Sequence, residues 1–299
     1  MLSRSQRINT FMEQIQEANK TGAIGLFARV LVQATLPHSK LLEPNGEKEK
    51  LDFTRRNGRL SLTVVGHRDV GLPYGSYPRL LLSWITSEAK RTNNRELVLG
   101  DSLNEFMKKL GIIPSRGRWG TVPRLQDQMQ RLFACTISYI REDDSNWSVE
   151  NTPIVRRANL WWNPKAPKQI CEMNSSVVLD EEFFNEVLHN PVPYKIDTLK
   201  ALKQSSMAVD IYLWVTYRNS YANKPFWIKW EDLQLQFGAQ YPSNVRGKLD
   251  FKKNFLEALR KVAYAYPEAI KLRPETNYLI FVPGRPDVSK RILIPTNLG

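Results

Sequence analysis

The clearest pattern of apolar and polar positions lies between residues 99 and 139. Apolar side chains recur there at positions i, i+3, i+4 and i+7, beginning at Leu103. Ser102 and Glu105 have the spacing of a capping box, and Gly111 stands where a helix end favours a residue that can take a positive φ angle. The pattern therefore predicts a short helix that begins at Leu103 and ends before Gly111.

A second apolar stripe follows and predicts a second helix. Thr121 is the expected cap of this helix, and Pro123 suits its first turn. Arg124, Asp127 and Arg131 fall on the side opposite the apolar stripe, so we expect them to face solvent. Strand-forming residues follow in the run TISYI. Helix, turn, helix and strand in this order predict a winged helix.

This second helix is a candidate for DNA recognition. A helix that shows arginines to solvent behind a basic turn can enter a DNA groove, and the turn before this helix is basic and carries the planar Trp119. The alternative is a solvated amphipathic helix of the kind found in any helical domain. The candidate DNA contacts in this part of the chain are Arg116, Arg118, Arg124, Gln128 and Arg131.

Two further elements are predicted before this helix pair. Residues 53–65 have the pattern of two strands that turn at Asn57 and Gly58, which is a strong hairpin signal. A longer helix follows, with Ser76 as its cap and Pro78 in its first turn. The run FARVLVQATL, upstream of the hairpin, predicts a buried strand or a short helix.

A polar excursion with four carboxylates follows the helix pair. Such a cluster can bind a cation or act in acid and base catalysis, but three of the four are near neighbours in the chain and no geometry converges them. We therefore interpret the excursion as the solvated tip of a wing, and Arg156 and Arg157 beyond it as possible phosphate contacts. The four carboxylates are Glu142, Asp143, Asp144 and Glu150.

A second complete unit is predicted after the segment NPVPYKID, which has two prolines and no periodicity. Its order of helix, strand, helix, helix, strand, wing and strand is that of a full winged helix. The expected elements are a helix capped by Ser205 or Ser206, a strand at 225–229, a helix at 230–237, a long helix from Pro242 and Ser243 to about Tyr264, and wing strands at 270–272 and 278–282.

The long helix carries most of the charge of this second unit. We expect its core stripe to hold Leu249, Phe255, Leu256, Leu259 and Val262, which leaves a polar, basic face outward. Lys248 and Lys252 fall within the apolar arc, so they snorkel or the helix starts later. Asn and Arg can pair bidentately with base edges, and cations neutralise phosphates. The candidate DNA contacts here are Arg246, Lys248, Lys253, Asn254, Arg260 and Lys261.

Composition supports a polyanionic partner. The 299 residues carry 43 Lys and Arg against 30 Asp and Glu, a formal net charge of +13. The length is sufficient for two domains with sizeable cores. The basic excess is concentrated towards the C-terminus, because the last third of the chain holds most of it.

Several classes of function lack their sequence signals. Cys135 and Cys171 have no metal-binding or redox spacing, and His38, His67 and His189 are scattered, so we expect no metal, no cofactor and no disulfide. The phosphate-binding motif GxxxxGK[ST] of ATPases is absent, and the histidine pair of a nicking initiator is not supplied. We expect no enzymatic activity. Without a membrane span or signal peptide, a cytoplasmic, reducing location is expected.

A family resemblance is carried by the strings GLPYGSYPRLLLSWITSEAKRT, LGDSLNEFMKKLG and RLQDQMQRLF, with LPHSK and RRNGRLSL upstream. Over residues 35–285 the chain resembles the RepA-type plasmid replication initiators of bacteria. The resemblance implies two winged-helix domains bound to repeated origin sequences, called iterons. It also implies opening of the adjacent DNA and recruitment of a host helicase or initiator protein. An alternative is a dimeric transcriptional repressor of its own gene, and a homodimer fits either function.

The predicted fold class is therefore α+β, with two tandem winged-helix domains. An amphipathic helix in residues 1–22 precedes them, as a docking element or a partner surface. The first winged-helix domain is expected at 23–190 and the second at 191–299. The string QLQF near residue 235 is weakly similar to a sliding-clamp peptide, but it lies in a helix that we expect to face the core.

Overall fold

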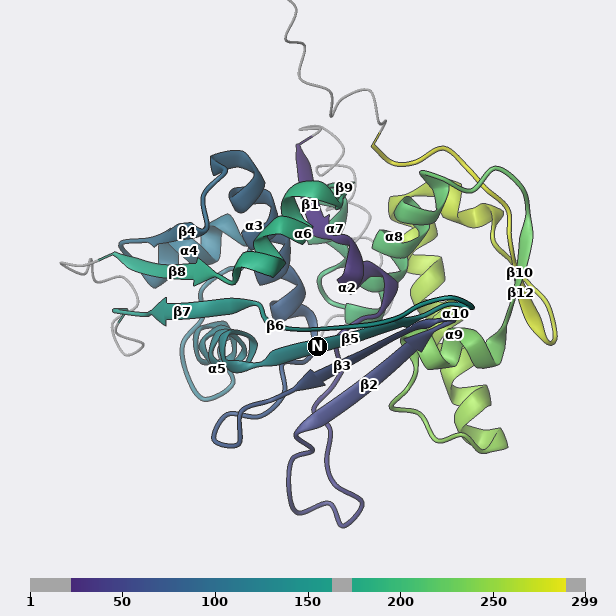
Figure 1. Cartoon of the computed structure of the whole chain (residues 1–299), viewed down its shortest axis with the longest axis horizontal. Helices are drawn as coiled ribbons and strands as arrows, with labels where there is room; N and C mark the ends of the chain where they lie inside the picture. The colour runs from purple at the N-terminus through teal and green to yellow at the C-terminus, as the bar shows by residue number, and fades with distance from the viewer. Residues whose placement is uncertain (1–22, 163–173, 289–299) are drawn as a thin grey trace, which may run out of the picture. The chain divides into compact units, whose positions relative to one another are not determined.

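The computed structural model describes residues 23–162 and 174–288 (Figure 1). The predicted N-terminal helix and Cys171 lie outside these residues. The chain divides into two compact units. We call Leu26–Pro191 the N-terminal unit, and the described residues before and after it form the C-terminal unit. Helices and antiparallel strand pairs build both units, so the mixed class of the fold is confirmed.

The N-terminal unit contains two antiparallel sheets with helices around them (Figure 1). One sheet has the strand order β2-β3-β5-β6, and the other has the order β4-β8-β7. The elements are β1 (Ile24–Ala28), α2 (Arg29–Gln33), β2 (Asp52–Asn57), β3 (Leu60–Val65), α3 (Ser76–Thr92), β4 (Glu96–Gly100), α4 (Leu103–Lys109), α5 (Thr121–Ala134), β5 (Thr136–Glu142), β6 (Trp147–Pro153), β7 (Val155–Asn159), β8 (Ser175–Leu179) and α6 (Glu181–His189).

The C-terminal unit surrounds one buried helix, α8, with a three-stranded sheet and further helices. Its sheet has the order β10-β12-β11. The elements are β9 (Pro191–Lys195), α7 (Ile196–Leu202), α8 (Ser206–Asn219), β10 (Phe226–Lys229), α9 (Trp230–Phe237), α10 (Val245–Ala265), the 3-10 helix η1 (Pro267–Lys271), β11 (Arg273–Pro274) and β12 (Tyr278–Phe281).

The two units repeat one order of elements. In the N-terminal unit, β4 lies between α3 and α4 in the chain and pairs with β8, and β8 pairs with β7. In the C-terminal unit, β10 lies between α8 and α9 and pairs with β12, and β12 pairs with β11. The N-terminal unit differs because the β5-β6 hairpin is inserted after α5. The repeat that the sequence predicted therefore extends to the pairing of the strands.

The acidic excursion has a different place from the one predicted. It forms the turn between β5 and β6, and this hairpin extends the β2-β3 hairpin into the four-stranded sheet, with Ile137 paired to Val64. The turn is exposed, as predicted, and Asp143 caps it by accepting hydrogen bonds from the backbone of Ser145 and Asn146. The strands that correspond to the wing of the C-terminal unit are instead β7 and β8.

Several element ends differ by a few residues from the predictions. Gly75 and Gly120, not Ser76 and Thr121, are the N-cap residues of α3 and α5. Gly75 has a φ angle of 76°, which a serine rarely adopts. The segment 270–272 is helical or irregular rather than a strand, and the strand before the last turn is the short β11.

An aromatic cluster forms the core of the C-terminal unit. The Trp214 ring of α8 lies 5.5 Å from the Phe237 ring of α9 and 5.4 Å from the Phe281 ring of β12, measured between centroids. Phe237 in turn lies 5.6 Å from the Phe255 ring of α10. These edge-to-face pairs stabilise the core beyond their buried area. They also fix α9, α10 and the sheet around one buried tryptophan.

Two buried arginines anchor the start of α3 in the N-terminal unit. Arg79 donates hydrogen bonds to the carbonyls of Leu36 (2.8 Å), Pro37 (3.2 Å) and Gly75 (2.6 Å). Arg55 of β2 donates to the carbonyl of Leu36 as well, at 3.4 Å. Both side chains are almost inaccessible to solvent, so their charge depends on these acceptors. The strings LPHSK, RRNGRLSL and GSYPR thus meet in one packing motif.

Candidate nucleic-acid interface

The turn before α5 is closed by two reciprocal hydrogen bonds. The Ser115 backbone donates to Thr121 Oγ1 at 2.8 Å, and the Thr121 backbone donates to Ser115 Oγ at 2.9 Å. A Cβ atom at Gly120 would lie 2.3 Å from the Ser115 carbonyl oxygen, so only glycine fits there. The hydroxyl of Thr121 therefore holds the turn closed instead of capping the helix.

This closed turn presents a basic and aromatic tip. Arg116, Arg118 and Trp119 are all exposed, and the Arg118 guanidinium lies 5.3 Å from the centre of the Trp119 ring. Arg124, one turn into α5, is exposed as well and donates to the Gly120 carbonyl at 3.1 Å. Three of the five predicted contacts of this unit thus lie together at the N-terminal end of α5.

The prediction that Arg131 faces solvent is wrong. Only 8% of this residue is accessible. Its guanidinium donates to Glu49 Oε2 at 2.7 Å and to Asp127 Oδ1 at 2.8 Å. Burial opposes the charge, but the hydrogen bonds to these two carboxylates raise the pKa of Arg131 above its usual value. Arg131 is therefore an internal anchor of this unit.

Gln128 is a second correction on the same helix. It is buried, and its Oε1 atom accepts a hydrogen bond from the Tyr74 backbone at 2.8 Å. Its amide nitrogen donates to Asp127 at 2.8 Å. The helix periodicity could not show this arrangement, because the segment that covers this face of α5 comes from more than 50 residues earlier in the chain.

Helix α10 shows a basic face to solvent. Arg246, Lys253 and Arg260 are exposed along it, and the Arg246 side chain is 86% accessible although it lies 3.3 Å from Asp250. Lys261 pairs with Glu257 at 3.4 Å. Exposed pairs of this kind contribute little to stability, so these cations can exchange their partners for phosphates.

Two other predicted contacts of α10 lie at its sides. Lys248 pairs with Glu231 of α9 at 3.1 Å. Asn254 is exposed and donates from Nδ2 to the Tyr241 hydroxyl at 2.9 Å. Both side chains are accessible, but each already has a partner within the C-terminal unit.

The core stripe of α10 agrees in part with the predicted one, because Phe255, Leu259 and Val262 are buried. Leu249 is 60% exposed rather than buried, and Phe251 is buried in the stripe instead. The helix begins at Val245, later than predicted, with Asn244 as its cap. Lys252, which the sequence placed in the apolar arc, donates to two backbone carbonyls of the β11-β12 turn and lies 4.7 Å from the centre of the Trp230 ring.

The N-terminal end of α10 is held in place by a buried glutamine. Gln234 of α9 donates from Nε2 to the Tyr241 carbonyl at 3.3 Å and to the Pro242 carbonyl at 3.1 Å. A Cβ atom at Gly247 would lie 2.0 Å from the Pro242 oxygen, so the turn packs tightly on the helix. Gln234 therefore positions α10. In the string QLQF, Gln234, Gln236 and Phe237 are buried as predicted, whereas Leu235 is exposed.

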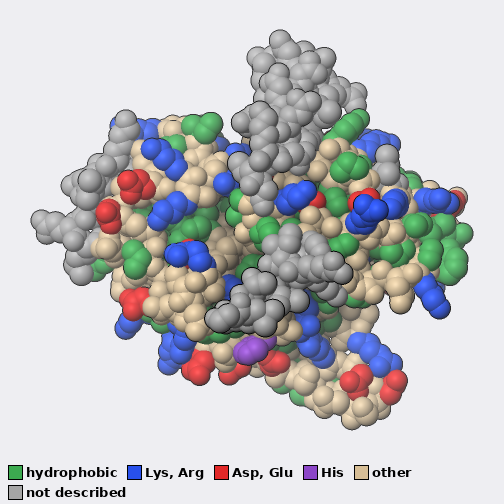
Figure 2. All heavy atoms as spheres, turned by 90° about the horizontal axis from the view of Figure 1, so that it is seen from above, with side chains coloured by type: hydrophobic (Ala, Val, Ile, Leu, Met, Phe, Trp, Pro, Cys, Tyr) green, Lys and Arg blue, Asp and Glu red, His purple; other side chains and the backbone are tan. Residues whose placement is uncertain are grey.

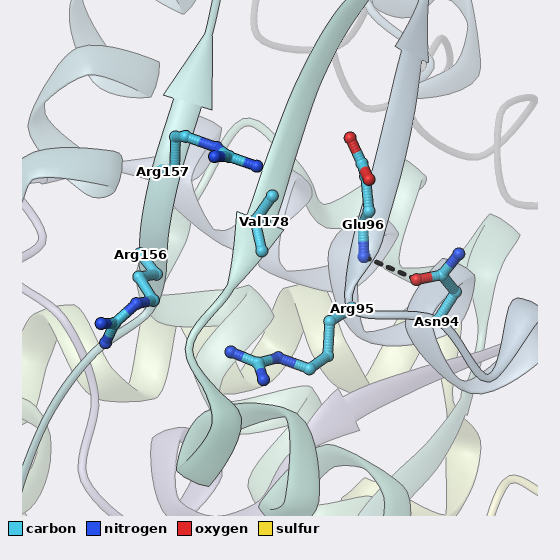
Figure 3. A pocket seen from close by; sticks show the side chains of 6 residues that line it. All are labelled: Asn94, Arg95, Glu96, Arg156, Arg157 and Val178. Atoms are coloured by element: carbon cyan, nitrogen blue, oxygen red, sulfur yellow. Dashed lines mark hydrogen bonds between the residues drawn. The ribbon is translucent and has the colours of Figure 1, made fainter.

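A third basic site lies on the β4-β8-β7 sheet. A pocket of about 540 Å³ is lined by Asn94, Arg95, Glu96, Arg156, Arg157 and Val178 (Figure 3). Arg156 and Arg157 are exposed on β7 and have no acidic partner within the described residues. Arg95 donates to the Leu179 carbonyl at 3.1 Å and to Glu181 at 3.1 Å. The pocket therefore combines two exposed arginines with a fixed one and the carboxylate of Glu96.

Net charge alone does not locate the interface. Figure 2 shows Lys and Arg side chains scattered over one face of the molecule among acidic and apolar ones.

Within residues 23–162 and 174–288, no cluster of His, Cys, Asp and Glu has the geometry to hold a metal ion. Over the same residues, no helix combines the length and the apolar character that crossing a membrane requires. Burial raises the pKa of the Cys135 thiol to about 12.

Comparison with known proteins places the chain in a family. The family model described as "Plasmid encoded RepA protein" matches residues 72–231, which is more than half of the chain. The chain therefore belongs to the family of plasmid-encoded RepA proteins, and the resemblance to RepA-type replication initiators is confirmed. The matched region runs from the segment before α3 to the start of α9.

Solved structures show a similar fold at low identity. A crystal structure of domains 2 and 3 of RctB, as selenomethionine derivatives, is 11% identical with a TM-score of 0.53, over 84% of this chain and 95% of that one. Another crystal structure of RctB domains 2 and 3 is 10% identical with a TM-score of 0.48, over 84% and 94% of the two chains. No curated protein sequence matches the chain.

Proposed function

We propose that this protein initiates plasmid replication by binding iterons at the plasmid origin as duplex DNA, with one winged helix in each unit. The main support is the repeated order of elements in the two units, in which the strand after the first helix pairs with the last strand of the sheet. That order is typical of winged helices, whose third helix enters the major groove. Counted from α3 and from α8, where the repeated order begins, the third helices are α5 and α10.

The exposed cations supply the binding surface of each third helix. Arg116, Arg118 and Arg124 lie at the N-terminal end of α5, and Arg246 and Lys253 lie on the outer face of α10. Each phosphate that they neutralise releases counterions and contributes affinity that does not depend on sequence. Base edges in the groove then supply sequence preference.

The proposed activity requires no covalent chemistry. Binding to several repeats concentrates deformation energy in the adjacent duplex, which favours its opening. A host helicase or initiator protein then enters the opened DNA. Nicking of supercoiled plasmid that depends on a divalent metal would contradict this non-enzymatic proposal.

The test is fluorescence anisotropy of the full-length protein with two labelled duplexes. One carries direct repeats from the plasmid's own origin, and the other has the same composition in shuffled order. We expect a preference of about a thousandfold for the repeats and a steep dependence of affinity on salt. Equal affinity for both duplexes would reduce the protein to a non-specific binder of DNA and overturn the proposal.

A further inference from the structure

Two aliphatic side chains lie at the outermost edge of α10, where a helix in water normally carries polar residues. Val245 is 76% exposed and Leu249 is 60% exposed. They are four residues apart and therefore lie one above the other on the same face. The buried stripe with Phe251 and Phe255 lies on another face of the helix. The exposure of the two side chains is thus a consequence of how the helix is rotated on its core.

Cations surround this aliphatic pair. Arg246 follows Val245 directly and pairs with Asp250, although 86% of its side chain is accessible. Lys253 lies one turn beyond Leu249 on the same face. A partner that covers the pair must therefore be apolar at the centre and negatively charged at its rim. The major groove of duplex DNA has this character, because thymine methyl groups lie on its floor and phosphates form its edges.

We propose that Val245 and Leu249 contact the C5-methyl groups of thymines, and that Arg246 pairs with a neighbouring guanine. The inference rests on the proposed function and deepens it, because it names the bases that α10 reads. The N-terminal residues of a recognition helix are the ones that approach base edges, and both aliphatic residues lie in the first two turns. Arginine pairs bidentately with guanine O6 and N7.

The structure fixes this end of the helix before any DNA is bound. Asn244 accepts a hydrogen bond from the Gly247 backbone at 2.8 Å, and Gln234 holds the preceding turn through two carbonyls. Val245 is β-branched and has few rotamers. A contact surface that is already ordered loses little conformational entropy on binding, so small apolar contacts can contribute to base preference.

Removal of single methyl groups from the DNA tests the inference. In the repeat duplex, deoxyuridine replaces thymine one position at a time, which deletes the C5-methyl group and leaves base pairing intact. For the wild-type protein we expect about a three- to tenfold loss of affinity at one or two positions, as for the loss of a buried methyl group. For Leu249→Ala, the same replacement at the position that Leu249 contacts should cause no further loss.

Leu235→Ala is the matched control, because Leu235 is a half-exposed leucine on α9 of the same unit. This variant should keep the full sensitivity to deoxyuridine. If the wild-type protein prefers the repeats but tolerates every deoxyuridine, the inference fails and the proposed function stands. If it does not prefer the repeats, both fail.

The mass of the protein in solution tests whether a second copy of the chain, rather than DNA, covers Val245 and Leu249. A second copy of the chain could also cover the aliphatic pair. Sedimentation of the wild-type protein and of Leu249→Ala should give the same mass. A change of mass in the variant, together with unchanged sensitivity to deoxyuridine, would overturn the inference and assign the pair to self-association.

Discussion

Arg131 of α5 donates a hydrogen bond to Glu49, 82 residues earlier in the chain, at 2.7 Å. The same carboxylate also forms an ion pair with Lys40. A Cβ atom at Gly71 would lie 2.3 Å from the Glu49 oxygen and 2.5 Å from the Arg131 nitrogen, and the φ angle there is 85°, so glycine is required. The Glu49–Arg131 pair thus ties the polar loop before β2 to α5.

Replacement of Arg131 should therefore destabilise the fold. Arg131→Met leaves Glu49 without its main partner in a partly buried site, and we expect a loss of about 3 kcal/mol in the free energy of unfolding. Urea denaturation followed by circular dichroism measures it. Arg124→Met is the control, because Arg124 is exposed on the same helix, and it should cost less than about 0.5 kcal/mol. Equal losses in the two variants would contradict the anchoring role.

The same pair predicts a dependence of stability on pH. The hydrogen bond from Arg131 is the largest effect on Glu49 and holds the pKa of this carboxyl below its usual value of 4.5. A group whose pKa is lowered by folding stabilises the protein above its unfolded pKa and loses this effect as the pH falls through the folded pKa. The melting temperature should thus fall below about pH 4.5 less steeply in Glu49→Gln than in the wild type. Parallel curves would contradict this assignment.

Arg79 should be the most sensitive arginine of α3. Arg79→Met removes hydrogen bonds to three carbonyls, of which Leu36 keeps a donor in Arg55 and Pro37 keeps one in the Gly75 backbone, and it leaves an apolar side chain among these acceptors. We expect a loss of about 1–3 kcal/mol in the free energy of unfolding, measured by thermal denaturation. Arg91→Met on the same helix breaks only an exposed pair with Glu88 and should leave the stability nearly unchanged. A mild effect of Arg79→Met would show that water replaces the guanidinium.

The basic turn before α5 should contribute phosphate contacts. Replacement of Arg116 and Arg118 by alanine should weaken binding to repeat and shuffled duplexes by a similar factor. The slope of log affinity against log salt should also fall by about 1 for each lost contact. Anisotropy titrations at several salt concentrations measure both effects. Asp144→Asn, in the acidic turn of the β5-β6 hairpin, is the control and should leave the slope unchanged. A loss confined to the repeat duplex would indicate base contacts instead.

Substitutions on α10 should weaken binding to the repeat duplex more than substitutions in the acidic turn of the β5-β6 hairpin. Arg246→Ala or Lys253→Ala should weaken binding to the repeats by about tenfold or more, because a bidentate base contact contributes about 1–3 kcal/mol. Competition with shuffled duplex separates this loss from general phosphate attraction. Equal losses from these variants and from changes in the 142–150 turn would contradict the role of α10 in recognition.

The pocket on the β4-β8-β7 sheet should bind the DNA backbone rather than bases. Arg156 and Arg157 lie on β7, one of the two strands that correspond to the wing of the C-terminal unit. Alanine at both positions should reduce the salt slope by about 2 without changing the preference for the repeats. Arg91→Ala, an exposed arginine outside the pocket, is the control. An unchanged slope would exclude the pocket from the interface.

Local sequence patterns determined the order of the elements and most of their ends. Ser102, Asp180 and Ser205 cap their helices through hydrogen bonds to residues two or three positions away, and such contacts depend only on neighbours in the chain. The Asn57-Gly58 signal likewise placed the first hairpin, although Gly58 and Arg59 form the turn itself. The family resemblance drew on the same strings, three of which build the anchor around Arg79.

Only the tertiary structure decided which polar residues are available to DNA. Helix periodicity placed Arg131 outward and Leu249 inward, and both were wrong, while Gln128, a candidate contact, is buried. The periodicity of an isolated helix reports one stripe and cannot show a second segment packed on the polar side. Glu49 and Tyr74 cover α5 from distant parts of the chain, and the packing of Phe255 on Trp230 and Phe237 of α9 sets which face of α10 is buried. The site is thus set by contacts between residues far apart in sequence, which local patterns do not encode.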